Sequence, residues 1–340
     1  MKQIWIPKAG PPEVLALREA ADPLPEAGEL RIRVEASGVN FADIVARLGS
    51  YPDLPPMPVV VGYEVAGRVD AVGDGVGSDW LGRDVLALTR FGGYSDVLCV
   101  PERQVHARPE GMSAEEGAAI PVNYLTAWQL VRVMGGLRSE ETVLVHSAGG
   151  GVGIAAIQLA RWIGARIFGT ASVAKHDALK SIGVDACIDY RTEDFEARVA
   201  ELTGQRGVEL VLDAVGGSSF KKSYRSLAPT GRLGMFGISS AATGKKPSRL
   251  SLLRAVAGMP WLQFNPVSLM NANKGVFGVN LGHLWEEADR VNDWLESLLD
   301  LYREGAIRPV IAERFPFERA AEAHDYLQDR KNFGKVLLVP

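Results

Sequence analysis

The chain has 340 residues, the length of about two ordinary domains. Its 37 basic and 41 acidic side chains leave a formal net charge of −4, and 47% of the residues are hydrophobic. This is the balance of a folded globular protein, and it gives no electrostatic signature of a DNA- or RNA-binding surface. The two cysteines, Cys99 and Cys187, are too few for a disulfide framework or a four-cysteine zinc lobe.

The sequence shows no targeting or membrane segment. Its first twenty residues lack an apolar core of signal-peptide length. The most apolar later stretch begins at Leu250, but Arg254 and Pro260 interrupt it before it is long enough to span a bilayer. We therefore expect a cytoplasmic protein without a transmembrane segment.

The first third of the sequence is typical of strands and turns. Apolar and charged residues alternate from Leu30 to Ala36, which is the period-two pattern of a half-buried strand. Further short strands are expected at 64–72, 84–88 and 94–100, separated by glycine-rich turns. This region is predicted to form a small antiparallel barrel.

After Pro121 the pattern changes to alternating strands and helices. Residues 142–146 form an almost wholly apolar run, as expected for a parallel strand covered on both faces, and a helix is predicted at 152–163. Further strands, with helices between them, are predicted at 165–170, 186–189, 208–213 and 231–236. This alternation predicts the α/β class with a doubly wound parallel sheet.

The last hundred residues are less regular. A strand is predicted at 274–281 and a long helix at 286–303. We expect the closing strand in GKVLLVP to return to the N-terminal barrel. The segment 250–270 is either a packed flank or lid of the second domain, or a lipid-contact element on the surface.

The strand at 142–146 leads into SAGGGVG and then directly into a helix, which is the context of a phosphate-binding loop. Ala148, Gly150 and Gly153 form the A-x-G-x-x-G variant of the dinucleotide fingerprint. The small residue at 148 allows the tight turn, Gly150 lets the backbone approach a pyrophosphate, and Gly153 lets the helix pack closely on the strand. The unpaired N–H groups at the helix N-terminus, including those of Gly151 and Val152, are expected to face the phosphate.

The residues after the next two strands favour NADPH over NADH. An NAD site usually has an acidic residue about 20 positions after the loop, whereas the second strand here ends in Thr170, Ala171 and Ser172. Lys175 lies just beyond, and Tyr190 follows the third strand. A cation without a nearby carboxylate suits a 2′-phosphate. The alternative is that these are solvated surface residues.

Ordered blocks along essentially the whole chain carry a family resemblance. They are GVNFADIVARLGSYP, GYEVAGRVDAVG, AAIPVNYLTAW, HSAGGGVGIAAIQLA, LDAVGG and FGKVLLVP. Together they resemble the zinc-independent medium-chain dehydrogenase/reductase superfamily, specifically its quinone oxidoreductases. The block FNPVSLMNANKGVFGVNLGHLW is most similar to the branch of the vesicle amine transport protein homologues. The resemblance implies a GroES-like β-barrel for the substrate at 1–122 and 282–340, a Rossmann domain for the cofactor at 123–281, and a cleft between them.

The resemblance also implies a site without metal. Zinc-dependent relatives have a cysteine where this chain has Asn40, a histidine where it has Tyr63, and a third ligand near Val122. None of these replacements is a good zinc ligand, and the five histidines show no paired ligand spacing. Hydride transfer without a Lewis acid favours acceptors that delocalise the incoming electrons, such as quinones and α,β-unsaturated ketones.

By resemblance, Asn40 lies beside the nicotinamide and Tyr51 lies on the substrate side. Tyr51 either donates a proton or hydrogen bond or only lines the pocket, and water or the ribose 2′-hydroxyl is an equal candidate for the proton donor. Asp43 in the same segment can simply cap the following helix. The family brings further residues to the cofactor, the last two at its phosphates: Asn123, Thr126, Phe236, Gly237, Ser239, Phe277, Val279, Asn332 and Lys335. The apolar ones among them can equally be core residues.

The leading prediction is an NADPH-dependent reductase of a small hydrophobic quinone or enone. The alternative is a non-catalytic or weakly catalytic NADPH-binding protein with a vesicle-associated, lipid-associated or structural role, as in some relatives. A homodimer is expected, because family members pair the edge strand of the Rossmann sheet, here 274–281, with its copy.

Overall fold

The computed structural model describes residues 1–242, 244, 253, 257 and 264–340. The chain divides into two compact units. The described part of unit 1 comprises Met1–Leu125, Gly244 and Gly282–Pro340, and that of unit 2 comprises 126–242, 253, 257 and 264–281. Most of the segment 250–270, for which the sequence left a lid, a packed flank and a lipid contact open, lies outside the described residues.

Unit 1 is built on two sheets. A larger sheet has the strand order β15-β16-β3-β5-β6-β8, with β7 also paired to β3, and a smaller one has the order β2-β1-β4. The strands are β1 (Lys2–Ile6), β2 (Ala16–Glu19), β3 (Glu29–Val39), β4 (Val59–Val60), β5 (Glu64–Val72), β6 (Asp84–Leu88), β7 (Val97–Pro101), β8 (Val105–Ala107), β15 (Ile311–Pro316) and β16 (Lys335–Val339). The helices are α1 (Phe41–Arg47), α2 (Ala114–Gly117), α10 (Ala288–Arg303) and α11 (Ala320–Gln328), and α3 (Pro121–Trp128) runs from unit 1 into unit 2.

The pairing of these strands agrees with the sequence prediction in its main points. Pairs between strands of the first third are antiparallel, and the last strand, β16, returns to pair with β3. Two features differ from the expectation. The pair β15–β16 is parallel, and the pairings described form an open path in which β8 does not return to β15.

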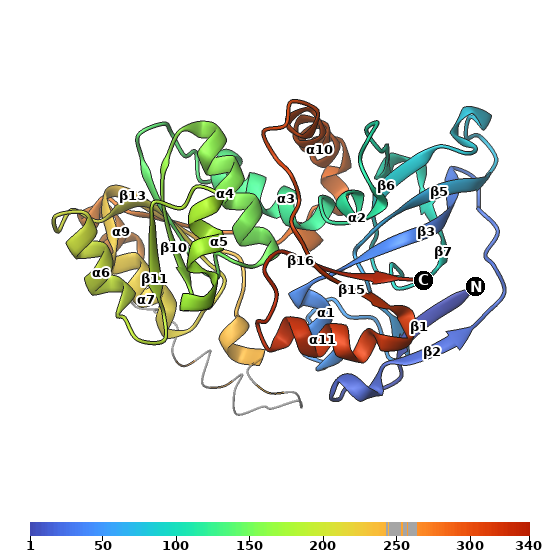
Figure 1. The fold of residues 1–340 in the computed structure, drawn as a ribbon, viewed down its shortest axis with the longest axis horizontal. Helices are drawn as coiled ribbons and strands as arrows, with labels where there is room; N and C mark the ends of the chain where they lie inside the picture. The colour runs from blue at the N-terminus through green and yellow to red at the C-terminus, as the bar shows by residue number, and fades with distance from the viewer. Residues whose placement is uncertain (243, 245–252, 254–256, 258–263) are drawn as a thin grey trace. The chain divides into compact units, whose positions relative to one another are not determined.

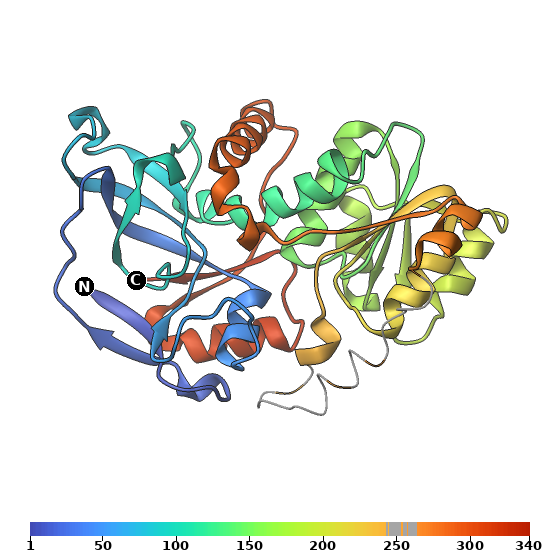
Figure 2. The ribbon, with the colours of Figure 1, turned by 180° about the vertical axis from the view of Figure 1, so that it is seen from behind.

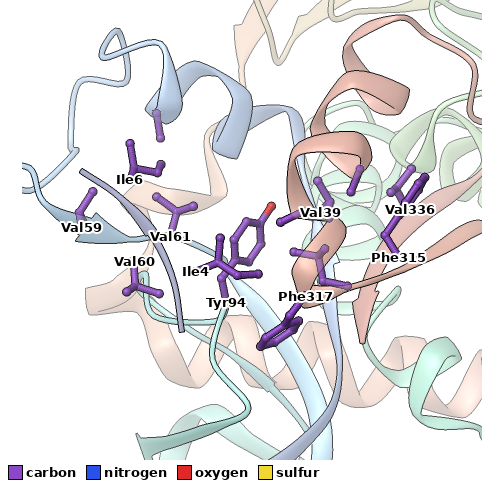
Figure 3. Close-up of a cluster of buried hydrophobic side chains, with 14 residues drawn as sticks. Ile4, Ile6, Val39, Val59, Val60, Val61, Tyr94, Phe315, Phe317 and Val336 are labelled. Carbon is purple, nitrogen blue, oxygen red and sulfur yellow. The ribbon is translucent and has the colours of Figure 1, made fainter. Parts of the chain in front are cut away.

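The core of unit 1 joins the two ends of the chain. Ile4 and Ile6 of β1 pack with Phe317 and Val336 from the C-terminal segment, and Tyr94 lies in the same buried cluster (Figure 3). Burial along β3 alternates as far as Glu35, and every residue from Ala36 to Val39 is buried. The chain therefore enters α1 from a fully enclosed strand end, and side chains placed there are shielded from water.

Unit 2 is a parallel sheet in the order β11-β10-β9-β12-β13-β14, which confirms the predicted doubly wound arrangement. Its strands are β9 (Thr142–Val145), β10 (Arg166–Ala171), β11 (Ala186–Asp189), β12 (Val208–Asp213), β13 (Leu227–Met235) and β14 (Gly275–Gly278). Its helices are α4 (Gly151–Ile163), α5 (His176–Ser181), α6 (Phe195–Leu202), α7 (Ser218–Arg225) and α9 (Pro266–Ala272). Right-handed crossovers place α4 and α5 on one face of the sheet and α6 and α7 on the other (Figure 1, and Figure 2 from behind).

One strand of unit 2 begins earlier than the sequence indicates. β13 starts at Leu227, whereas the prediction began at residue 231. The turn-forming residues Pro229, Thr230 and Gly231 lie inside the strand, where the register with β12 shifts and Thr230 has a φ of 67°. An irregularity within a strand therefore has the same sequence signature as a turn before it.

None of the helices in the described part of the chain is long and apolar enough to cross a membrane.

Candidate active site

The glycine loop of unit 2 lies between β9 and α4, where the sequence places it. Gly150 is the residue that precedes the first turn of α4, so no side chain caps the helix N-terminus. A Cβ atom on Gly153 would lie 2.5 Å from the carbonyl oxygen of Ser147 and 2.6 Å from that of Ala148, so only glycine fits there. The loop thus offers bare backbone and the free N–H groups of a helix terminus, which is a cradle suited to a pyrophosphate.

The residues predicted to select the cofactor follow the strands beside this loop. β10 lies between β9 and β11, and the ends of β10 and β11 are in register at Ala171 and Asp189. Ser172 follows β10 directly, and Lys175 ends a short 3₁₀ turn after it. Tyr190 follows β11 with its side chain 40% exposed. The structure therefore brings Ser172, Lys175 and Tyr190 to the same sheet edge as the glycine loop.

The carboxylate of Asp189 at this edge is already engaged. Its Oδ1 accepts from the Arg191 N–H at 3.2 Å, and its Oδ2 accepts from the Thr192 hydroxyl at 2.9 Å. These contacts hold the carboxylate within its own turn. Ser172, Lys175 and Tyr190 therefore lie beside an acid that is held in its own turn, and their contact with a 2′-phosphate stays a prediction.

The remaining predicted residues of unit 2 are divided between the sheet edge and its core. Phe236, Gly237 and Ser239 follow the end of β13 at the same edge. Phe277 lies in β14, and its ring covers Gly234 so closely that a Cβ on that glycine would lie 2.7 Å from Cζ. Three further predicted residues are buried: Thr126 in α3, Ala148 in the loop and Val279 after β14.

A row of buried, hydrogen-bonded polar side chains, which the sequence did not indicate, lies at the end of β9 where the glycine loop begins. His146 follows β9 with Nδ1 3.0 Å from the Thr170 hydroxyl and Nε2 3.1 Å from that of Ser223. Because Ser223 donates its single proton to Asp213 at 2.6 Å, it accepts from Nε2–H, and Nδ1 accepts from Thr170. Burial lowers the pKa of His146 and keeps the ring neutral. The histidine is thus a packed core residue that joins β9, β10 and α7.

In unit 1, Asn40 belongs to a buried group of polar residues, here called the Asn40 cluster (Asn40, Asp43, Glu64 and Lys335). The Lys335 ammonium donates to Asn40 Oδ1 at 2.6 Å and also to Glu64 Oε1. The Asn40 amide nitrogen donates to the same Glu64 oxygen at 2.9 Å. The other Glu64 oxygen accepts from the Val122 N–H at 2.7 Å, in the first turn of α3. A Cβ on Gly38 would overlap the Glu64 carboxylate, so this glycine leaves the space for it.

Asp43 holds the backbone of the same segment. Its Oδ2 accepts from the Asn40 N–H at 2.8 Å, which is the helix-capping contact that the sequence offered as one interpretation. Its Oδ1 accepts from the Gly62 N–H at 3.1 Å. Asp43 is completely buried, and this burial raises its pKa from 3.8 to about 7, although both N–H contacts oppose the shift.

Tyr51 lies in a group of three aromatic residues, here called the tyrosine cluster (Tyr51, Tyr63 and Phe91). The ring centroids lie 5.9 Å apart for Tyr51 and Tyr63, 5.3 Å for Tyr63 and Phe91, and 6.5 Å for Tyr51 and Phe91. Burial raises the pKa of both tyrosines, so both hydroxyls stay protonated at neutral pH. The Tyr63 hydroxyl is buried, and it lies close enough to the Tyr51 hydroxyl for each phenol to affect the pKa of the other.

Three residues of these two clusters were not among the site residues predicted from the sequence. Glu64 and the Tyr63 hydroxyl lie in the block GYEVAG, where an acid beginning an otherwise apolar strand was the available signal. Phe91 gave no signal, because it reaches the cluster from a turn in which its own φ is 72°.

Three predicted residues of unit 1 are buried away from open solvent. Lys335 is 3% exposed, and its ammonium contacts Asn40 and Glu64, while the expected phosphate contact stays a prediction. Asn332 donates from Nδ2 to the Gly334 carbonyl at 2.8 Å and so shapes the turn before β16. Asn123 is buried in α3. Within the described ranges, no group of three His, Cys, Asp or Glu side chains is placed to hold a metal ion.

Known proteins are similar to this chain along its whole length. Residues 26–110 match the family described as alcohol dehydrogenase GroES-like domain, and residues 182–338 match the one described as zinc-binding dehydrogenase. The synaptic vesicle membrane protein VAT-1 homolog of Mus musculus is 43% identical over 329 residues, which cover 96% of this chain and 80% of that protein.

Solved structures are similar at the level of the whole fold. The quinone oxidoreductase of Escherichia coli, in complex with NADPH, superimposes with a TM-score of 0.86 at 30% identity and covers all of both chains. The CurK enoyl reductase superimposes with a TM-score of 0.84 at 27% identity, covering 99% of this chain and 98% of that one.

Proposed function

The chain belongs to the medium-chain dehydrogenase/reductase superfamily, to its quinone oxidoreductase type and to the branch of the VAT-1 homologues, and from this we propose that it uses NADPH to reduce a quinone or an α,β-unsaturated carbonyl compound. Similarity to quinone and enoyl reductases supports reductase activity in general, and NADPH and the substrate class are the parts that we propose. The observation that carries the proposal is the glycine cradle at α4 in a chain similar from end to end to an oxidoreductase in complex with NADPH.

The residues of unit 2 that would hold NADPH fall into two groups. The loop Ala148–Gly153, with the α4 N-terminus, suits the pyrophosphate because no side chain separates its N–H groups from a ligand. Ser172, Lys175 and Tyr190 suit the 2′-phosphate, since the acid at the same edge is held in its own turn. NADPH, when bound, supplies a hydride and becomes cationic at its nicotinamide ring. We propose that the amide of Asn40 lies beside that ring.

The tyrosine cluster supports a flat, conjugated acceptor. Three aromatic rings at mutual distances of 5.3 to 6.5 Å provide faces and edges against which a quinone or enone can pack. The buried Tyr63 hydroxyl lies next to that of Tyr51, so a ligand oxygen that reaches Tyr51 also comes near Tyr63. We therefore add Tyr63 to Tyr51 and Asn40 as a residue that meets the substrate.

The chemistry of Tyr51 follows from its environment. Negative charge develops on the acceptor oxygen as the ring or double bond is reduced, and a fixed hydroxyl donor stabilises it. Because burial raises the pKa of Tyr51, this phenol is a weaker acid than a free tyrosine and acts by donating a hydrogen bond rather than by releasing its proton. Water or the ribose 2′-hydroxyl then completes the reduction as the proton source.

Loss of NADPH absorbance in the presence of a quinone panel and an enone panel tests this function. We expect turnover with members of at least one panel, faster with NADPH than with NADH. Tight NADPH binding without turnover on either panel would contradict the reductase proposal. It would instead support the alternative of a non-catalytic NADPH-binding protein.

A second candidate function is an NADPH-binding protein that associates with vesicle or lipid surfaces. It is favoured by the 43% identity to a synaptic vesicle membrane protein and by two exposed apolar side chains on α9, Val267 and Met270. Co-sedimentation with liposomes that contain anionic lipid tests it, and Val267→Ser/Met270→Ser should abolish the binding. The same α9 precedes β14, the edge strand through which we propose that two copies pair.

A further inference from the structure

Lys335 is a buried cation that forms an ion pair with the Glu64 carboxylate. The lysine and the glutamate side chains are 3% and 0% exposed, so water neither solvates nor screens them. Neither carboxylate oxygen of Glu64 is free, because one accepts from Lys335 and Asn40 and the other accepts from the Val122 N–H. The pair is therefore fixed in place by strands β5 and β16 and by the first turn of α3.

This ion pair allows the Asn40 amide only one orientation. Asn40 Oδ1 faces the Lys335 ammonium at 2.6 Å, and Nδ2 faces a Glu64 oxygen at 2.9 Å. Turning the amide over would place its N–H groups against the ammonium and its oxygen against the carboxylate. Both contacts would then be repulsive, and repulsion is strong where the local dielectric is low.

The backbone of Asn40 is held as firmly as its side chain. Its N–H donates to Asp43 at 2.8 Å, and the same carboxylate ties this segment to Gly62. An asparagine amide has two N–H donors and two oxygen lone pairs. One of each is used by Lys335 and Glu64, and this sets the direction of the second amide N–H.

We propose that Lys335 and Glu64 are positioning residues that fix the Asn40 amide for the nicotinamide end of the cofactor. The inference rests on the proposed function, which places Asn40 beside the nicotinamide. It assigns Lys335 a role different from the phosphate contact expected from the sequence. The Glu64 carboxylate neutralises the Lys335 ammonium within the cluster, so the charge that a phosphate would need is already committed.

Two ligands distinguish these roles. NADPH carries the nicotinamide, whereas 2′-phospho-ADP-ribose lacks it and keeps the pyrophosphate and the 2′-phosphate. The dissociation constants of both are measured, by fluorescence for NADPH and by calorimetry for the fragment, with wild-type protein and with Lys335→Met/Glu64→Gln. The double variant removes both buried charges together, because a single change leaves the other charge unpaired and endangers folding.

We expect the double variant to bind NADPH ~10-fold more weakly and to bind the fragment within ~2-fold of the wild type. Lys335→Arg keeps a cation opposite Glu64 and should lose less NADPH affinity than the double variant. Lys2→Met is the matched control, since Lys2 forms an exposed lysine–glutamate pair with Glu318 at 3.0 Å in the same unit. Circular dichroism verifies that each variant is folded.

Equal weakening of NADPH and the fragment would overturn the inference and return Lys335 to the phosphates. Unchanged affinity for both ligands in a folded double variant would overturn it as well, because the pair would then be purely structural. Failure of the proposed function has a different signature: the wild-type protein would then either bind neither ligand or bind NADPH without turning over any acceptor.

Discussion

Two buried groups of unit 1 are expected to give its stability opposite dependences on pH. Asp43 is completely buried, and burial raises its pKa from 3.8 to about 7. His324 of α11 is also completely buried, and burial, followed by the nearby Arg47 cation, lowers its pKa from 6.5 to about 3. Its Nε2 lies 3.1 Å from the Tyr94 hydroxyl in the core shown in Figure 3. Substituting either group should therefore leave the pH dependence of stability that the other group causes.

The sign of each contribution follows from which state binds the proton. Between its two pKa values Asp43 is protonated in the folded chain and ionised in the unfolded one, so stability falls as pH rises toward about 7. His324 is neutral in the folded chain and protonated in the unfolded one from about pH 3 to 6.5, so there stability rises with pH. Each slope is about 1.4 kcal/mol per pH unit, which accumulates to about 4 kcal/mol for Asp43 and about 5 kcal/mol for His324.

The two slopes overlap between about pH 4 and 6.5 and should nearly cancel in the wild-type protein. Asp43→Asn, which keeps an oxygen for one of the N–H donors, should leave a stability that rises by about 1.4 kcal/mol per pH unit. His324→Gln, which keeps a partner for Tyr94, should leave a stability that falls by the same amount. Urea unfolding at several pH values measures both slopes, and the double variant should be flat. An Asp43→Asn curve that runs parallel to the wild type would refute the assignment of a buried proton to Asp43.

The remaining predictions concern the cofactor, the substrate, the loop and the assembly. Lys175→Ala should raise the KM for NADPH by roughly one to two powers of ten and leave that for NADH almost unchanged, whereas equal losses would make Lys175 a solvated surface residue. Tyr51→Phe should lower kcat/KM by roughly 10-fold, and a loss beyond about 1000-fold would instead identify an essential acid. Gly153→Ala should lower stability by about 1–3 kcal/mol in thermal unfolding, because its Cβ meets two carbonyl oxygens at 2.5 and 2.6 Å. Light scattering at micromolar concentration should give the mass of a dimer, and a monomeric mass would contradict pairing through β14.

Strands of both units were predictable where their signals are local. Strands β5, β6, β11 and β12 have the bounds that the sequence indicates, and each is a short apolar or alternating run between turn residues. The glycine loop is equally local, since a strand, a set of small residues and a helix follow one another directly. Where irregular backbone imitates a turn, as in the first residues of β13, the same reasoning places the boundary too late.

The Asn40 cluster was not predictable in the same way. Its contacts join residues that are 24, 271 and 295 positions apart, and no periodic pattern extends over such separations. Lysine and glutamate are almost never fully buried unless they pair, so each one alone is expected at the surface. Only the tertiary structure brings Lys335 of the last strand to Glu64 of β5, and only Gly38 leaves the space that the carboxylate occupies.

The buried polar and charged side chains discussed above for unit 1 lie together rather than scattered through its core. The apolar cluster of Figure 3 contains aliphatic and aromatic side chains of the kind that any sandwich of strands would bury. At the junction of β3 and α1, by contrast, the chain buries a lysine, two carboxyl groups and an amide, and the tyrosine cluster contains the buried Tyr63 hydroxyl. A buried ion pair is rarely more stable than an apolar replacement of the same volume. Stability therefore does not explain this concentration of polar groups, and the requirement to hold one amide in one direction does.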